Sequence, residues 1–253
     1  PIANHPDVQR MMLSMRSRIE AMRALSLYTA SCADRATHHP DQKQRLLGQQ
    51  RVDVLTPVVK GWSSEVGNEV TALALQVHGG MGFIEETGAA QHQRDARILT
   101  IYEGTTGIQA LDLAGRKTLY DQGAAMADLV QQMRDDLSLH GHAVTKSHQS
   151  AMAEAINGLE SSYQTLLQQA PNDVMFAGAI SFDLLMLSGY VCGAWQMMRS
   201  ASLVAQEDNE SFKTNKLVTV AYYLDHILPR FESHRRSILA GSQSVMAIAV
   251  GDL

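Results

Sequence analysis

Apolar side chains in the first part of the chain recur at a helical spacing. From Asp7 to about Ala33, charged residues separate apolar ones that follow at steps of 3, 4 and 3, namely Met12, Met15, Ile19 and Met22. This period places the apolar side chains on one face. The segment is therefore predicted to form a long amphipathic helix that packs against a core or another helix.

The next apolar patterns predict further helices. The polar segment Asp34–Pro40 is expected to be a loop, and Asp41–His78 a second helical region with a kink or a restart at Pro57. The Gly-Gly-Met-Gly run at residues 79–82 should end that helix. Two more helical stretches are expected, at Glu86–Arg97 and at Thr105–Tyr120.

Beyond Tyr120 the sequence has four helical patterns joined by polar loops, at residues 124–139, 149–169, 173–205 and 211–239. Asn172 or Asp173, and Asn209, stand where helix N-caps belong. The pattern contains no convincing strand and no internal repeat. We therefore predict an all-α protein with two helical bundles, residues 1–120 and 121–253, that divide near residues 120–123.

Composition narrows the class of protein. The 253 residues carry a formal net charge of -5, with 45% hydrophobic and 19% charged residues, which suits a folded, soluble chain. Serine, glycine, aspartate or glutamine interrupts the longest apolar stretches before the ~20 residues that a membrane span needs. The mildly acidic balance, without a Lys/Arg-rich face, argues against nucleic acid or anionic lipid as the main partner.

The two cysteines, Cys32 and Cys192, are too few for a disulfide framework, and both stand in patterns typical of a helical core. We expect buried, reduced thiols and a cytoplasmic location. The sequence begins with proline rather than methionine and shows no signal peptide, so a piece of a longer polypeptide is one interpretation.

Residues 76–109 carry the candidate chemistry. Gln76 lies about one turn before the glycines at 79–82. There the backbone can approach a ligand closely, and the glutamine can bond an adenine edge or a phosphate. Taken alone, an ordinary helix C-cap is the favoured interpretation. In Arg94-Asp95-Ala96-Arg97 a carboxylate stands among guanidiniums, and a structural salt bridge is favoured.

Glu103 is a candidate general base. It stands between the apolar run Ile98–Tyr102 and the flexible sequence Gly104-Thr105-Thr106-Gly107. A carboxylate at the end of an apolar run is a candidate for partial burial, which would make it a stronger base. The alternative is a solvated glutamate at a helix start, since either threonine can serve as the N-cap. The hydroxyls and amides of this turn could also hold phosphate or flavin oxygens.

In this order and spacing, these elements resemble the C-terminal helical domain of the acyl-CoA dehydrogenases, over about residues 5–118. The tail from about Asp121 resembles the extra helical C-terminal domain of a longer subgroup, which includes enzymes like 3-methylmercaptopropionyl-CoA dehydrogenase. The matching elements are Gln76-x-x-Gly79-Gly80-x-Gly82-Phe83, Arg94-Asp95-Ala96 and Ile101-Tyr102-Glu103-Gly104-Thr105, followed by Ile108-Gln109.

The resemblance implies a fold and a reaction. The fold is a four-helix-type bundle followed by a second helical domain. The reaction is the α,β-dehydrogenation of an acyl-CoA thioester to a trans-2-enoyl-CoA, a step of fatty acid metabolism. Glu103 matches the base that removes the α-proton while the β-hydrogen leaves as hydride to flavin N5. Gly104 matches a position that contacts substrate, where a side chain would crowd the thioester.

The resemblance also implies FAD as the cofactor. One matching segment binds the adenosine-diphosphate end of FAD, usually across a subunit interface, and consists of Gln76, Val77, His78, Gly79 and Gly80. A second matches the turn that also touches FAD, and consists of Thr105, Thr106 and Gly107. Many family members have glutamine where this chain has Gly107, so only a backbone contact is expected there.

The family's N-terminal helices and middle β-domain, which supply most of the flavin pocket, have no counterpart here. We therefore expect the C-terminal portion of a longer or split enzyme, inactive in isolation. The implied partners are an acyl-CoA substrate, an electron-transfer flavoprotein and further copies in a dimer or tetramer. Alternatives are an acyl-CoA oxidase of the same fold, or a helical interaction module that lost the chemistry.

Other polar and aromatic features favour structural interpretations. The adjacent His38 and His39 lack a third ligand at useful spacing, so no metal site is expected. Trp195 suits a core better than a ligand site. Arg230, Arg235 and Arg236 are expected to form a solvated basic face. Three glycines suggest close helix packing against a neighbouring bundle or subunit, namely Gly178, Gly189 and Gly193.

Overall fold

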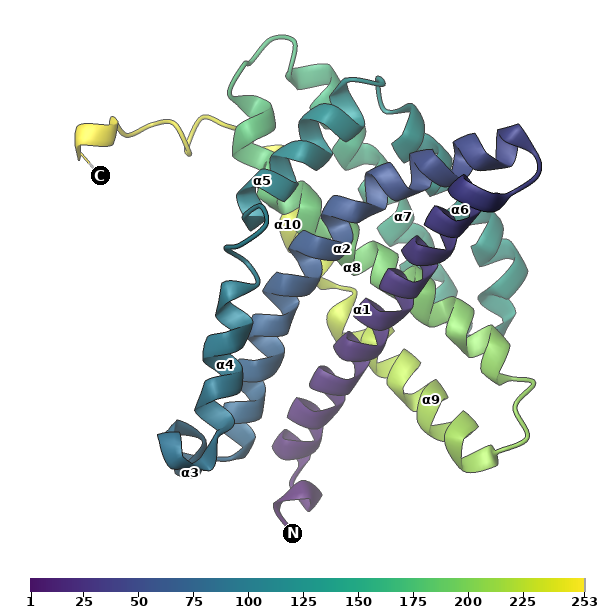
Figure 1. Ribbon diagram of the computed structural model, residues 1–253, viewed down its shortest axis with the longest axis vertical. Helices are drawn as coiled ribbons and strands as arrows, with labels where there is room; N and C mark the ends of the chain where they lie inside the picture. The colour runs from purple at the N-terminus through teal and green to yellow at the C-terminus, as the bar shows by residue number, and fades with distance from the viewer. Residues whose placement is uncertain (253) are drawn as a thin grey trace.

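The computed structural model describes residues 1–252, and every regular element in that range is helical (Figure 1). This confirms the predicted all-α class. The main helices are α1 (Pro6–His38), α2 (Gln42–Val77), α3 (Gly80–Phe83), α4 (Ala89–Ile98), α5 (Thr106–Leu111), α6 (Ala124–His140), α7 (Lys146–Gln169), α8 (Phe176–Val204), α9 (Glu210–Tyr222) and α10 (Arg230–Ala240). Short 3₁₀ segments are η1 (Ile2–Asn4), η2 (Glu85–Thr87), η4 (Gly141–Ala143) and η6 (Val250–Asp252), and π-helical segments are η3 (Asp112–Leu119) and η5 (Tyr223–Ile227).

Helices α1 and α2 form a long antiparallel pair (Figure 1). The predicted loop over Asp34–Pro40 is wrong for its first five residues, because α1 continues through His38. Arg35 and His38 stand in its last turn, where cationic side chains favour the helix. Asp41 then caps α2 by accepting from the Lys43 amide. The turn between the helices is therefore only a few residues long.

Pro57 neither ends nor restarts α2, which is assigned as one helix from Gln42 to Val77. The residues around the proline explain why. Val54, Leu55 and Val58 are almost completely buried, and burial of an apolar face supplies most of the stability of a helix in a protein. The predicted restart was therefore wrong, because tertiary packing holds the helix together across the missing amide.

Helix α8 runs through the centre of the second half and is buried almost from end to end. Trp195 lies in this core, as predicted, and its indole nitrogen donates to a carboxylate oxygen of Asp136 at 2.8 Å. Trp62 of α2 packs on Gly189 and Gly193, so the predicted close approach at these two glycines is to a neighbouring bundle. Gly178 has open space around it. Both parts of the chain thus contribute to one hydrophobic core, while a division at residues 120–123 stays a prediction.

Within residues 1–252, one helix, α8, is long and apolar enough to cross a bilayer by length and composition. The sequence argument missed it because it counted uninterrupted apolar residues, whereas serine and glycine lower the mean hydropathy only slightly. In the most apolar window of α8, 72% of the residues are buried inside the protein. That burial is typical of a core helix.

Several predicted helices are divided in the structure. The stretch expected at Glu86–Arg97 begins as η2, and Gly88 (φ 78°) separates it from α4. The stretch expected at Thr105–Tyr120 changes from α5 into the π-helical η3, and residues 211–239 become α9, η5 and α10, with Pro229 before the last. The N-cap at Asn209 is confirmed, but Asp173 accepts from the Met175 amide in a turn before α8.

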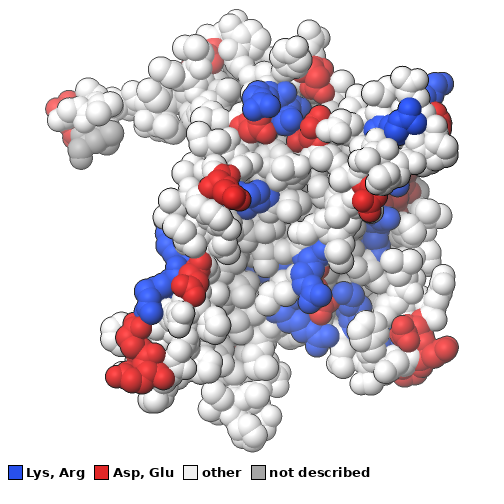
Figure 2. Space-filling view, viewed as in Figure 1, with Lys and Arg blue, Asp and Glu red and all other residues white. Residues whose placement is uncertain are grey.

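Positive and negative side chains adjoin one another over the face shown in Figure 2. Three of the ion pairs tie distant helices together: Arg51 of α2 with Asp128 of α6, Arg134 of α6 with Glu160 of α7, and Lys216 of α9 with Glu20 of α1. Charges in this protein therefore serve largely to join elements.

Candidate functional site

The candidate residues gather at two places along α2. Gln76 lies at its carboxyl end, beside the glycine run, whereas Lys60 near its middle touches the turn that carries Glu103. Gln76 lies sixteen positions after Lys60, which corresponds to about 24 Å along an α-helix. The chain thus brings Glu103, Gly104, Thr105, Thr106 and Gly107 together, and holds Gln76 to Gly80 as a separate group.

The glycine run has two different functions in the fold. Gly79 ends the helical path with φ 59°, and a Cβ on Gly79 or Gly80 would meet no atom within 4 Å. Gln76 and His78 beside them are exposed, and Val77 is half-buried. At Gly82, by contrast, a Cβ would lie 2.3 Å from the carbonyl oxygen of Leu75. Gly82 therefore serves packing, while Gly79 and Gly80 present bare, accessible backbone.

The Glu103 turn has an unusual backbone. Glu103 has φ 51° and Gly104 has φ 88°, so two consecutive residues lie in the left-handed region, which costs about 1–2 kcal/mol for a residue with a Cβ. A Cβ on Gly104 would also lie 2.8 Å from Nε2 of Gln109. Non-glycine residues held in this region cluster at functional sites. The geometry directs attention to Glu103 independently of its sequence motif.

The carboxylate of Glu103 is exposed in this chain, and the expected partial burial is therefore wrong for residues 1–252. The apolar run before it explains the difference, because Ile98, Leu99 and Ile101 are themselves exposed and do not enclose the glutamate. Glu103 lines one side of a pocket of about 250 Å³, together with Lys60, Ser63, Ser64, Leu99 and Tyr102.

Polar side chains of α2 make hydrogen bonds to the turn that carries Glu103 and to the segment before it. The ammonium of Lys60 donates to the carbonyl oxygens of Leu99 at 2.8 Å and Gly104 at 2.5 Å. The Thr106 hydroxyl donates to Glu65 at 2.6 Å, and Asn68 donates to the Ala96 carbonyl at 3.1 Å. Sequence reasoning missed Lys60, Glu65 and Asn68. Their polar side chains did not stand out on a helix that has many other polar residues, and their partners lie far away in sequence.

The two threonines after Gly104 already have partners. Thr105 caps α5 by accepting from the Ile108 amide, which confirms one of the two predicted caps. Thr106 is buried, and its hydroxyl donates a hydrogen bond to the carboxylate of Glu65. Gly107 is exposed, and a Cβ there would have only one neighbour within 4 Å, the Thr105 hydroxyl at 3.8 Å. Backbone at Gly107 is thus the accessible part of this turn.

The salt bridge expected within Arg94-Asp95-Ala96-Arg97 is replaced by another. Arg94 pairs with Glu85 at 2.5 Å, across the turn that precedes α4. Asp95 instead faces a pocket of about 770 Å³, which His78 and His92 also line. On a helix, adjacent residues point in different directions, so Arg94 and Asp95 do not meet.

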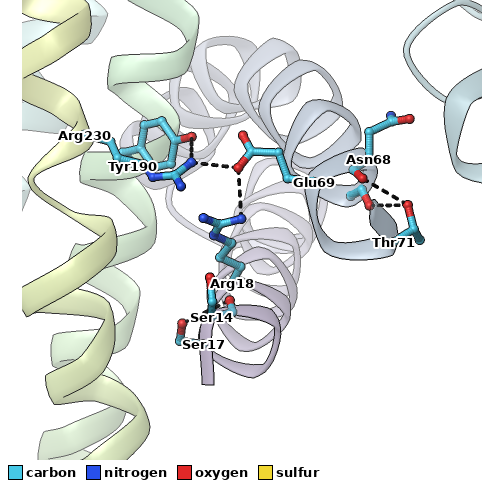
Figure 3. Close-up of polar contacts among 9 residues, drawn as sticks. Ser14, Ser17, Arg18, Asn68, Glu69, Thr71, Tyr190 and Arg230 are labelled. Atoms are coloured by element: carbon cyan, nitrogen blue, oxygen red, sulfur yellow. Dashed lines mark hydrogen bonds and ion pairs between the residues drawn. The ribbon is translucent and has the colours of Figure 1, made fainter. Parts of the chain in front are cut away.

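A third pocket, of about 540 Å³, lies beside Gln76. Its wall contains a charged network, in which a single oxygen of Glu69 accepts from Arg18 at 2.9 Å and from Arg230 at 2.7 Å (Figure 3). Arg230 also reaches the hydroxyl of Tyr190 at 3.4 Å. Burial, together with the nearby charge of Arg230, lowers the pKa of Arg18. The network joins α1, α2, α8 and α10.

The expected solvated basic face is therefore wrong for Arg230, which pairs with Glu69 at the junction of helices. Arg235 and Arg236 both pair with Glu232 within α10. His39 is engaged locally, since its Nδ1 accepts from the Asp41 amide. Among residues 1–252 no three His, Cys, Asp or Glu side chains are grouped as a metal would require.

Fold and site together define an all-helical domain in which the long helix α2 ends at a bare glycine run and, near its middle, contacts a left-handed Glu-Gly turn that lies between α4 and α5. Residues 1–118 match the family model described as "Acyl-CoA dehydrogenase, C-terminal domain", and residues 124–249 match the one described as "Acetyl-CoA dehydrogenase C-terminal like". The chain belongs to the acyl-CoA dehydrogenase family, as its motifs indicated.

Two relatives align over nearly the whole chain. The 3-methylmercaptopropionyl-CoA dehydrogenase of Ruegeria pomeroyi is 38% identical over 99% of this chain and 43% of its own length. The broad-specificity linear acyl-CoA dehydrogenase FadE5 of Mycobacterium tuberculosis is 31% identical over 98% of this chain and 43% of its own length. The chain therefore spans less than half the length of these relatives.

A solved structure has the same fold. An acyl-CoA dehydrogenase from Bacillus anthracis, in complex with FAD, superposes with a TM-score of 0.74 over 95% of this chain and 43% of that one, at 18% identity.

Proposed function

We propose that the chain is the C-terminal portion of an FAD-dependent acyl-CoA dehydrogenase that converts an acyl-CoA thioester to a trans-2-enoyl-CoA. The observation that carries this proposal is the turn at Glu103 and Gly104. Family membership alone would be compatible with a scaffold, but a scaffold does not require a glutamate at φ 51° with its carboxylate exposed. Strained backbone of this kind persists where function depends on it.

Glu103 is assigned as the general base, which accepts the α-proton of the thioester on its carboxylate. The exposed carboxylate requires a partner surface to exclude water from it, and we assign that surface to parts of the enzyme outside this chain. Gly104 lies beside the base and leaves room for the thioester, since no side chain projects from it. The backbone amide of Glu103 would polarise the thioester carbonyl and so ease removal of the proton.

FAD fits the two accessible backbone segments. Gly79 and Gly80 have no neighbour within 4 Å of a Cβ, so a dinucleotide can approach their backbone closely. The exposed Gln76 and His78 flank them, and we assign Gln76 through Gly80 to the adenosine-diphosphate end. Backbone near Thr105 and Gly107 is assigned to the flavin end. When bound, FAD would supply the hydride acceptor for the β-hydrogen.

The remaining assignments follow from family membership. We propose that the enzyme passes electrons to an electron-transfer flavoprotein and assembles as a dimer or tetramer, in which Gln76 through Gly80 serve a neighbouring copy. The cytoplasmic location is proposed separately, from the two free, buried thiols. An acyl-CoA oxidase would use the same base. The rate at which oxygen reoxidises the reduced full-length enzyme distinguishes the two, since fast reoxidation would identify the oxidase.

The test uses the full-length enzyme with Glu103→Gln, which keeps the size of the side chain but removes the base. We expect FAD to stay bound and turnover of acyl-CoA to fall by at least about a hundredfold. Glu86→Gln is the matched control, because Glu86 is also exposed and lies in η2, at the other end of α4 from Glu103. Turnover near the wild-type rate in Glu103→Gln would remove Glu103 from the role, and absence of flavin bleaching by any acyl-CoA in the wild type would refute the function.

A further inference from the structure

The ammonium of Lys60 has hydrogen-bond partners that are uncommon for a lysine, because both are backbone carbonyl oxygens. Its two hydrogen bonds go to the carbonyl oxygens of Leu99, at 2.8 Å, and Gly104, at 2.5 Å. The ring of Tyr102 lies 5.9 Å from the same nitrogen. None of the ion pairs among residues 1–252 includes Lys60. A surface lysine usually pairs with a carboxylate or with water, whereas this one is committed to the backbone.

The two carbonyls lie on either side of Glu103. Leu99 is the last residue of the helical path from α4, and Gly104 directly follows the glutamate. A charge-assisted bond to each end fixes the length and the direction of the segment between them. Further along α2, Asn68 holds the carbonyl of Ala96 and thus extends the same support to the preceding turn.

The turn needs such support because its backbone is unfavourable. Glu103 (φ 51°) and Gly104 (φ 88°) are both left-handed, and an unsupported chain of this sequence would leave that region. Side chains of α5 do not enclose Glu103, and its carboxylate is exposed. Within the segment, the Thr106 amide donates to the carbonyl oxygen of Thr100 at 3.1 Å. Side chains of α2 add tertiary support on both sides of Glu103, from Lys60 to Leu99 and Gly104 and from Glu65 to Thr106.

We infer that Lys60 is a positioning residue for the base. Its ammonium holds the backbone of the Leu99–Gly104 turn in a single conformation, which fixes the position and the direction from which the side chain of Glu103 projects. This inference rests on the proposed role of Glu103. Lys60 does not touch the reacting atoms in this account. It acts by removing alternative turn conformations, and small displacements of a catalytic group are costly to rate.

The test compares Lys60→Met and Lys60→Arg in the full-length enzyme, with Lys43→Met as the control, since Lys43 is an exposed lysine on the same helix. Methionine keeps the length of the stem but cannot donate to either carbonyl. We expect Lys60→Met to keep its FAD and to lower kcat about tenfold or more, with a smaller change in KM. Lys60→Arg should restore most of kcat, and Lys43→Met should resemble the wild type.

A second readout is independent of activity. Hydrogen exchange of the amides in residues 100–105 should become faster in Lys60→Met while protection of the core helix α8 stays unchanged. Equal loss of protection in residues 100–105 and in α8 would mean that Lys60 only stabilises the fold, and would overturn the inference. Unchanged exchange in residues 100–105 together with a wild-type kcat would also overturn it. If instead the wild type is inactive, or Glu103→Gln is fully active, the proposed function fails whatever Lys60 does.

Discussion

The indole of Trp62, in α2, lies directly on the backbone of Gly189, in α8. A Cβ on Gly189 would be 2.0 Å from Cγ of the indole, and one on Gly193 would be 2.3 Å from the hydroxyl oxygen of Tyr223. These glycines let α2 and α8 approach closely enough to bury Trp62 completely. The helix that ends at the glycine run and supports the Glu103 turn through Lys60 is thereby anchored to the second half of the chain.

Gly189→Ala should therefore destabilise the protein by about 2–3 kcal/mol, because overpacking forces either the indole or the helices to move. Gly178→Ala is the matched control on the same helix. A Cβ there meets no atom within 4 Å, so it should be neutral or stabilise by up to about 1 kcal/mol through helix propensity. Urea unfolding of both variants measures the difference, and equal midpoints would contradict the packing described here.

The Arg18–Glu69–Arg230 network should be strongly coupled. Glu69→Gln leaves the Arg18 guanidinium, which is only 2% exposed, without a compensating charge, and should cost about 1–3 kcal/mol. A double-mutant cycle of Glu69→Gln with Arg230→Gln should give a coupling free energy of at least about 0.5 kcal/mol. Arg236→Gln, at an exposed pair in α10, should cost almost nothing. Additive effects at Glu69 and Arg230 would contradict the network.

Acid should weaken the contact between α1 and α9. Burial acts to raise the pKa of Glu20, but hydrogen bonds from Lys216 and Arg16 outweigh it and lower the pKa below the ordinary value of 4.5. A depressed carboxyl pKa stabilises the fold above about pH 4.5, and that contribution is lost as the pH falls through the folded-state pKa. Glu20→Gln should thus be less stable at pH 7 and lose less stability between pH 5 and 3.

Both cysteines should resist thiol reagents in the folded protein. Cys32 and Cys192 are buried and free, and burial raises the pKa of the Cys192 thiol to about 12. Since the thiolate is the reactive form, labelling of the native protein at pH 8 should proceed only at the rate of opening, whereas both thiols should react at once in denaturant. Rapid labelling of Cys192 without unfolding would show that the α8 core is open in solution.

Local sequence determined much of this protein. The spacing of Met15, Ile19 and Met22 predicts a helix because a period near 3.6 needs no distant partner to be recognised. The face that it named for packing was wrong, because Ile19 is exposed while Ala21 and Leu25 are buried. Gly79 ends α2 because only glycine takes φ 59° at no steric cost. The motif around Glu103 identified the family that the comparisons then showed.

The tertiary structure decided the rest, because it depends on which distant residues meet. Helix α1 extends past Asp34, and α2 continues through Pro57, since packing on a neighbour outweighs local preference. The exposure of Glu103 and its support by Lys60, some 40 residues earlier, follow from how α2 and the turn are juxtaposed. Composition and period cannot encode such a contact. They indicate that a segment is helical, and only the folded chain determines which of its side chains are buried and what lies against them.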